Sequence, residues 1–347
     1  MSFFSTATAQ GARLRFHNIL VVIKQTAFEE YSQLKLRGQA PKALRWKRLE
    51  DRYKAHKQCV TDLLSVLRQH QVSFSCVNRV ELDRQHLADV DLMIAVGGDG
   101  TVLSSAHFLD HGTIPLLGIN SDPNVTIEDR RVKKQVDERR SHGALCMCTA
   151  RNMADELALV LYGGGHLHSR TRIRCKVKST FSETRLVPAL NDILIANPSP
   201  AAVSRFRMGW MQLVPEGAPS ETYGTITRFG GKAYDVVNSL NVWSSGMWMC
   251  TATGSTAAMA AAGGHIMPFD SEDLQYLIRE HMLEEDSASE VNNGLIRTGE
   301  KLHVRWNSQK GRIFIDGSHL TQNLELGDEI MIDSKAPPLK LFTREFI

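Results

Sequence analysis

The sequence predicts an α/β domain with a parallel sheet followed by a mainly β domain. The chain has 347 residues, which is more than one ordinary hydrophobic core holds. Strand-like and helix-like stretches alternate through the first 165 residues, whereas apolar residues recur with a period of two after residue 166. We therefore expect domains at 1–165 and 166–347.

The first domain is predicted from apolar runs that are separated by helix-spaced segments. Strands spaced by helices are typical of a parallel sheet with helices on its faces. We expect strands at 19–23, 72–77, 90–96 and 114–119, and helices at 50–70, 101–109 and from 153 to the glycines at 163–165.

The second domain is predicted from strict alternation of polar and apolar residues, first seen at 172–178. Helices are expected only in the Ala-rich stretch after Ser255 and at 273–282. Further strands are expected at 193–195, 210–214, 223–228, 302–306, 312–315 and 329–332. A highly charged stretch at 128–140 is interpreted as a solvated surface excursion.

Composition excludes several classes of protein. A hydrophobic fraction of 42% excludes wholesale disorder. A net charge of +3, from 41 basic and 38 acidic residues, argues against a nucleic-acid or anionic-membrane partner, so any anion binding must be local. The charge-free run at 236–269 is rich in hydroxyl residues and glycines, which argues against a membrane-spanning helix there.

The cysteines and the N-terminus bear on the compartment. The six cysteines are dispersed, which favours reduced thiols inside a cell. Cys146 with Cys148 and His166 with His168 do not complete a zinc-type spacing. We expect a cytoplasmic protein; the alternative is a mitochondrial or other organellar one, because the first 28 residues contain no acid and several basic and hydroxylated residues.

The strongest motif is Gly-Gly-Asp-Gly-Thr at 97–101, between an apolar strand and a helix. Glycines at the carboxyl end of a parallel strand let backbone N–H groups approach phosphate oxygens, and a helix start adds further N–H groups. Asp99 would repel a phosphate, so we expect it to accept a proton from a reacting hydroxyl or to help hold Mg²⁺. The alternative is a tight turn in which Asp99 caps the helix.

Two later segments are rich in hydrogen-bonding groups. Small and hydroxylated residues crowd the stretch 250–259, which would suit a base or a ribose; the alternative is a close-packed Ala-rich helix with a hydroxyl cap. Asn191 and Asp192 begin an apolar strand, where an amide can contact an adenine edge and a carboxylate can accept from ribose hydroxyls. The alternative is that they close a turn.

Together these segments resemble the NAD kinase family. The Gly-Gly-Asp-Gly-Thr block, the Asn-acid pair and the Thr-Gly-Ser-Thr-Ala block before Gly263 and Gly264 stand in that family's order, and the resemblance spans residues 18–332. The plant-type NADH kinase branch is the most similar, on the stretches 118–123, 198–206, 279–280 and 314–317.

The resemblance implies an NAD kinase/diacylglycerol kinase-like α/β domain, a β-rich C-terminal domain and a homodimer or higher homo-oligomer. It also implies Mg²⁺-dependent transfer of a phosphoryl group from ATP to the adenosine ribose 2′-hydroxyl of NADH or NAD, without a nucleic-acid or membrane partner. Asp99 matches the essential aspartate, near which Mg²⁺ would lie on the phosphates; no side chain is assigned as a metal ligand. The implied nucleotide-binding residues are Gly97, Gly98, Gly100, Thr101, Asn120, Asn191, Asp192, Thr253, Gly254, Ser255, Thr256 and Ala257.

The sequence differs from the family's usual residues at three places, all in the part that would bind the dinucleotide. Residues 122–124 stand where the family has a Leu-Gly-Phe stretch, Ser245 where it commonly has an aspartate, and Ala258 where it commonly has a tyrosine. The preference between NADH and NAD is therefore left open. Two other functions are also weighed: a lipid kinase of the diacylglycerol or sphingosine type, which shares the glycine turn, and a catalytically silent dinucleotide sensor.

Overall fold

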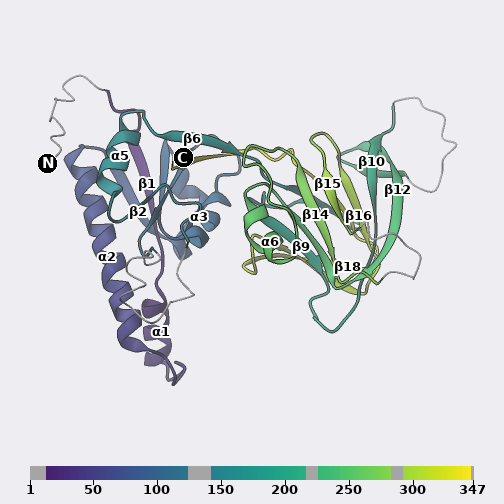
Figure 1. Ribbon diagram of the computed structural model, residues 1–347, viewed down its shortest axis with the longest axis horizontal. Coiled ribbons are helices and arrows are strands. Elements are labelled where there is room, and N and C mark those ends of the chain that lie inside the picture. Colours follow the sequence, from purple (N-terminus) through teal and green to yellow (C-terminus); the bar gives the residue numbers. More distant parts are fainter. Residues whose placement is uncertain (1–12, 124–141, 216–225, 283–291, 345–347) are drawn as a thin grey trace. The chain divides into compact units, whose positions relative to one another are not determined.

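The computed structural model describes residues 13–123, 142–215, 226–282 and 292–344. The chain divides into two compact units (Figure 1). Each unit has its own hydrophobic core. The first contains the described residues up to His168 and those from Lys340 on, and the second contains those of Ser169–Leu339. Among the described residues, no helix combines the length and apolar character that a membrane span requires.

The first unit is built on a sheet in the order β2-β1-β3-β4-β20-β6, with β5 paired to β4. The pairs β1–β2, β1–β3, β3–β4, β4–β5 and β4–β20 are all parallel. The strands are β1 (Asn18–Ile23), β2 (Ser73–Asn78), β3 (Leu92–Gly97), β4 (Leu116–Asn120), β5 (Cys148–Thr149), β6 (His166–Arg170) and β20 (Leu339–Thr343). The predicted parallel sheet is confirmed.

Helices lie on both faces of this sheet. Helices α2 (Trp46–Gln69) and α5 (Met153–Leu161) share one core with alternate residues of β1 and β3, such as Val21 and Ile94. Helix α3 (Asp99–Ala106) packs on β3 and β4 from the other face, where Gly118 leaves room for the Val102 side chain. Helix α1 (Ala27–Leu36) and the 3₁₀ turns Arg79–Glu81 and Arg84–Leu87 also belong to the described part of this unit.

The C-terminal strand departs from the expected domain boundary. We expected residues 166–347 to form one domain, but β20 pairs in parallel with β4, in the first unit. Leu339 and Leu341 are fully buried and Phe342 packs edge-on against Phe16. A short strand that is apolar on both faces fits the interior of a parallel sheet, because helices cover both faces there.

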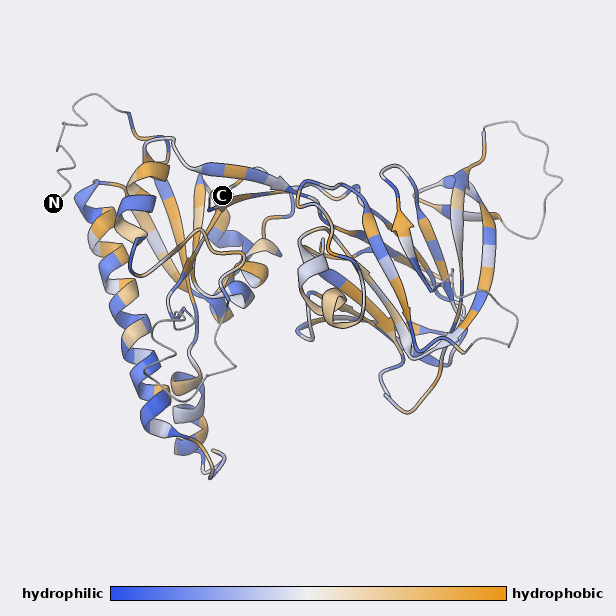
Figure 2. Cartoon of the chain, in the orientation of Figure 1, coloured by the Kyte–Doolittle hydropathy of each residue, from blue (hydrophilic) through white to orange (hydrophobic). Residues whose placement is uncertain are grey.

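The second unit consists of two antiparallel sheets, in the orders β11-β12-β10-β16-β19-β7-β8 and β15-β14-β13-β9-β17-β18. Their strands are β7 (Arg174–Lys178), β8 (Glu183–Arg185), β9 (Asp192–Ala196), β10 (Ser204–Leu213), β11 (Ile226–Phe229), β12 (Lys232–Ser244), β13 (Gly246–Cys250), β14 (Leu274–Arg279), β15 (Asn293–Ile296), β16 (Leu302–Trp306), β17 (Lys310–Ile315), β18 (Leu320–Glu325) and β19 (Glu329–Asp333). Side chains from both sheets form one core, for example Phe206 and Trp306, which stack on each other in the first sheet, and Ile313 from the second. Apolar residues alternate with polar ones along the strands (Figure 2). The predicted mainly β domain is confirmed.

The expected helix at 273–282 is wrong, because residues Leu274–Arg279 form strand β14. Its alternate residues Leu274, Tyr276 and Ile278 enter the core, and β13 and β15 pair with both of its edges. The Ala-rich stretch is helical but short: a 3₁₀ turn at Gly254–Thr256 and α6 (Ala258–Ala261). The charged stretch 128–140 and the start of the strand expected at 223–228 lie outside the described residues.

Candidate functional site

Three parallel strands of the first unit end at a topological switch point. After β1 the chain passes through α2 to β2, whereas after β3 it passes through α3, on the opposite face, to β4. Ile23, Gly97 and Asn120 end β1, β3 and β4, and Gly97 pairs in register with Asn120. Ligands of open α/β sheets bind in the crevice beyond such strand ends, between neighbouring strands whose connections run to opposite faces.

The glycine turn occupies this crevice, and its residues have different surroundings. A Cβ on Gly97 would lie 2.2 Å from Thr101 Oγ1, and Thr101 is itself buried. Gly98 is the N-cap of α3, and Gly100 is exposed with open space around it. Gly97 and Thr101 therefore pack against each other, whereas Gly100 is exposed and Gly98, although buried, lines the neighbouring pocket.

The structure also gives Asp99 an arrangement that the sequence did not reveal. Asp99 is the first residue of α3 and not its cap. Its two carboxylate oxygens accept the backbone N–H groups of Gly143, at 3.0 Å, and Leu145, at 2.8 Å. The only sequence signal for this contact was a lone glycine, Gly143, so the segment that orients Asp99 was missed.

Asn120 meets the same segment. Its side chain is buried at the end of β4, and its Oδ1 accepts the backbone N–H of Asp122 at 3.2 Å. A Cβ on Gly143 would lie 2.7 Å from Asn120 Nδ2. Gly143 thus contacts two of the predicted site residues, Asp99 and Asn120.

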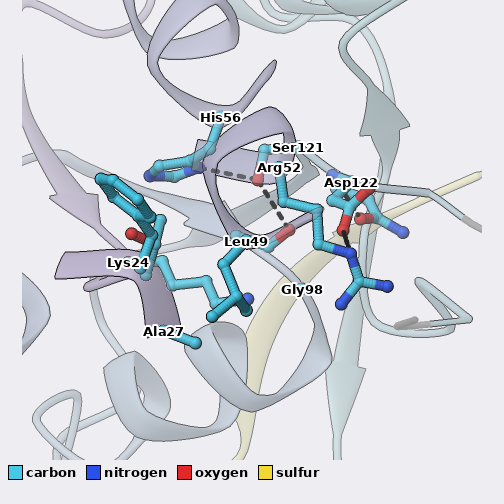
Figure 3. Close-up of a pocket in the computed structure, with 12 residues that line it drawn as sticks. Lys24, Ala27, Leu49, Arg52, His56, Gly98, Ser121 and Asp122 are labelled. Atoms are coloured by element: carbon cyan, nitrogen blue, oxygen red, sulfur yellow. Dashed lines mark hydrogen bonds and ion pairs between the residues drawn. The ribbon is translucent and has the colours of Figure 1, made fainter. Parts of the chain in front are cut away.

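A pocket opens beside the turn (Figure 3). Gly97 and Gly98 line it, together with Lys24 after β1, Arg52 and His56 on α2, and residues 120–122 at the end of β4 and just after it. Lys24 and Arg52 carry positive charge toward the side of the pocket where Gly98 lies (Figure 3). Of these, only Asn120 and the two glycines were predicted as site residues.

A buried hydrogen-bond chain supports the turn from behind. His56 Nδ1 lies 2.8 Å from Ser121 Oγ, and the Ser121 hydroxyl donates to the Gly97 carbonyl at 3.3 Å. Burial, followed by the nearby charges of Lys24 and Lys57, lowers the pKa of His56 to about 4. The imidazole is therefore neutral at neutral pH and acts as a hydrogen-bonding group.

The remaining predicted residues lie together in the second unit. A Cβ on Gly254 would lie 2.0 Å from the carbonyl oxygen of Asn191, so only a glycine permits this contact. The hydroxyl of Thr251 donates to the Leu190 carbonyl at 2.5 Å, and its backbone N–H donates to the Asn191 carbonyl at 2.9 Å. Two segments that are 60 residues apart in sequence are thereby joined.

The predicted hydroxyl residues of this group differ in exposure. Ser255 is fully buried; its hydroxyl donates to the Ala252 carbonyl at 2.7 Å and accepts the Met267 N–H at 3.0 Å. Thr253 is half-buried, whereas Thr256 and Ala257 are exposed. Ser255 therefore shapes the segment, and Thr253, Thr256 and Ala257 are the members that a ligand can reach.

Asp192 is paired with a second carboxylate that the sequence did not identify. Asp316 accepts the backbone N–H groups of Leu190, Asn191 and Asp192 at 2.7 to 3.0 Å. Burial, followed by the charge of Asp316, raises the pKa of Asp192 to about 7. Asp316 has a φ of +48° and precedes Gly317, and this Asp-Gly turn after a strand was the available sequence signal.

Ser245 and Ala258, the two positions of the second unit that differ from the family's usual residues, lie near a wide hollow. Ala258, Trp248 and Glu280 line it, and its empty volume is about 1180 Å³ including open solvent. Ser245 donates a hydrogen bond from its hydroxyl to the Glu280 carboxylate. A carboxylate is therefore present beside position 245, but it comes from the end of the neighbouring strand.

Within the described ranges, no group of three or more His, Cys, Asp or Glu side chains is placed to hold a metal ion. Cys146 and Cys148 are buried free thiols in the first unit. The predicted site residues thus form two groups, one in each unit, and neither contains a preformed metal centre.

Comparison with known proteins places this geometry in a family. Residues 14–124 match the model of the ATP-NAD kinase N-terminal domain. The chain is 36% identical over 310 residues to a probable NADH kinase of Oryza sativa, covering 89% of this chain and 87% of the relative. It is 36% identical over 294 residues to an NADH kinase of Arabidopsis thaliana, covering 85% of each chain.

Solved structures agree on the fold. An NAD kinase from Archaeoglobus fulgidus in complex with ATP superposes with a TM-score of 0.59 at 17% identity, over 94% of each chain. Yeast NADH kinase complexed with NADH gives the same TM-score at 15% identity, over 94% of this chain and 84% of that one. The resemblance inferred from the motifs is confirmed, and the chain belongs to the NAD kinase family.

Proposed function

We propose that this protein transfers the γ-phosphoryl group of ATP to the adenosine ribose 2′-hydroxyl of NADH or NAD. The observation that carries the proposal is Asp99, fixed by two N–H donors at the start of α3 and directly beside an open glycine turn. A carboxylate at a phosphate turn serves the reacting hydroxyl or the metal, because it would repel the phosphate alone. The relatives named as NADH kinases support the same chemistry.

Each part of the first group then has a defined task. Backbone N–H groups at Gly98 and Gly100 bind phosphate oxygens where the α3 dipole favours negative charge. Asp99 orients the attacking hydroxyl and accepts its proton, while the ATP β–γ bridge oxygen leaves with the electron pair of the broken P–O bond. Gly143 and Leu145 keep the carboxylate in one orientation.

The residues present fit Mg²⁺ bound through the substrate. Magnesium is commonly held by one or two carboxylates together with substrate phosphates, so a cage of three or more protein ligands is not required. Asp99 would supply the carboxylate, and the ion would neutralise charge on the phosphoryl oxygens. The second group, with Asn191 and Asp192, would bind the dinucleotide through amide and carboxyl hydrogen bonds.

The direct test is the variant Asp99→Asn. We expect it to fold and to bind NADH, while turnover with ATP and Mg²⁺ falls by roughly 10²–10⁴-fold, the usual contribution of a general base. Calorimetric binding of NADH and formation of NADPH are measured on the same preparation. Near-normal turnover in the variant would overturn the assignment.

Wild-type assays separate the alternatives. NADH, NAD and a diacylglycerol are offered as acceptors, and product from the lipid alone would support a lipid kinase. Stabilisation by dinucleotide without any product would support a silent sensor. The hydrogen-bonding group around Asn191 and Gly254 favours a dinucleotide over a lipid tail.

Assembly and location are part of the proposal. We expect a homodimer or a higher homo-oligomer, which sedimentation of the purified chain tests. A cytoplasmic location stays the prediction; residues 1–12, which could carry an organellar signal, lie outside the described residues. Imaging the full chain with a C-terminal tag tests it.

A further inference from the structure

Two basic side chains, Lys24 and Arg52, line the pocket at the switch point, and a third, Arg79, lies near enough for its charge to act on Lys24. Lys24 follows β1, Arg79 follows β2 and Arg52 lies on α2. Arg52 Nε lies 3.5 Å from the Asp122 carboxylate. Among the charged groups near Lys24, Asp122 raises the pKa of the ammonium, whereas Arg52 and Arg79 lower it.

Lys24 is held beside the glycine turn by its backbone. Its N–H donates to the Val96 carbonyl at 3.0 Å, which extends the β1–β3 pairing past the end of β1. A Cβ on Gly97 would lie 3.0 Å from the Cβ of Lys24. Lys24 is exposed as a residue, but desolvation of its ammonium lowers its pKa; the charge of Asp122 raises this pKa in part, and the charges of Arg52 and Arg79 lower it further.

The start of α1 contributes little to this positive field. Thr26 and Glu29 form a capping box in which the Glu29 carboxylate accepts the Thr26 N–H at 2.9 Å. Glu29 also pairs with Lys57 at 3.2 Å. The anion attraction of the pocket therefore comes from its side chains and the glycine turn.

We propose that Lys24 and Arg52 bind the triphosphate of the phosphoryl donor; this inference rests on the proposed kinase function. An anionic ligand would stabilise the excess of positive charge next to Gly98. Arg guanidinium and Lys ammonium groups are the usual partners of phosphate. A triphosphate carries more negative charge than the diphosphate of a dinucleotide and so gains more from this site. On binding, the Arg52 guanidinium exchanges its ion pair with Asp122 for a phosphate.

The test compares Lys24→Met and Arg52→Gln with Lys54→Met. Lys54 lies on the same helix as Arg52, but its exposed side chain pairs with Glu50 and is absent from the pocket lining. We expect each pocket variant to weaken binding of a non-hydrolysable ATP analogue by roughly 10- to 100-fold, the value of a hydrogen bond to a charged group. KM for ATP should rise in parallel, while binding of NADH and the control variant stay unchanged.

The outcomes are distinct. Unchanged affinity for the analogue in both variants, or a loss of NADH binding in place of analogue binding, would overturn the inference. Lys24→Arg and Arg52→Lys keep the charge and should recover part of the affinity, which separates binding from misfolding. Because calorimetry with the analogue needs no turnover, a wild-type protein that binds it but forms no NADPH would refute the kinase function alone.

Discussion

The carboxylate of Asp99 accepts the backbone N–H of Gly143 at 3.0 Å, although 44 positions separate the two residues. Gly143 has a φ of +73° and lies against Asn120. One glycine therefore sets the position of the carboxylate and of a buried amide in the crevice.

Gly143→Ala is expected to lower turnover by roughly 100-fold, the cost of a displacement of about 1 Å in a catalytic group. The added Cβ strains a left-handed backbone and meets the Asn120 side chain at 2.7 Å. Gly38→Ala is the matched control, since Gly38 has a φ of +70° in the same unit with open space around it. Equal activity losses in the two variants would contradict a positioning role for Gly143.

The glycine turn gives a second comparison, between Gly97→Ala and Gly100→Ala. Gly97→Ala should destabilise the protein, because its Cβ clashes with Thr101 at 2.2 Å. Gly100→Ala should leave the melting temperature equal or higher, since the position is open and helical. If phosphate approaches there, Gly100→Ala still raises KM for ATP. An unchanged KM would remove Gly100 from the site.

Asp192→Asn tests the buried carboxyl pair through pH. With a folded pKa of about 7 and an unfolded value of 3.8, the folded protein holds more protons between these values, so stability falls as pH rises through this window. The variant should lose this dependence and become more stable than wild type above pH 7, by at most roughly 4 kcal/mol. Urea unfolding of both proteins at pH 4.5 and 7.5 measures this difference in stability. The variant should also bind NADH more weakly than the wild type. A variant that is less stable than the wild type at pH 7.5 would contradict the raised pKa of Asp192 beside Asp316.

His56 should produce a pH dependence of the opposite sign. Its folded pKa of about 4 lies below the ordinary value of 6.5, so its contribution is complete above pH 6.5 and is lost as pH falls toward 4. The loss amounts to roughly 3 kcal/mol at most. His56→Gln keeps a hydrogen-bonding group near Ser121 but removes the titration, so its unfolding free energy should vary less between pH 7 and 5. Parallel curves for the two proteins would show that His56 is not responsible.

Local patterns were sufficient for much of the fold. The apolar run before Gly97 predicted β3, and strict alternation at 172–178 predicted β7, because side-chain periodicity follows from backbone geometry within one element. The same rule failed for 273–282, where Leu274–Arg279 form β14 because neighbouring strands pair with both edges. Partners distant in the sequence decided that element.

The sequence by itself determined the two-domain architecture, the glycine turn and the family, since each depends on residue types at short spacing. The tertiary structure alone decided that β20 joins the first sheet, that Gly143 and Leu145 hold Asp99, and that Asp316 accompanies Asp192. It also brought Lys24 and Arg52 to the pocket beside Gly98. These contacts depend on hydrogen bonds and charges that act over a few ångströms of space, which the spacing of residues along a chain does not encode.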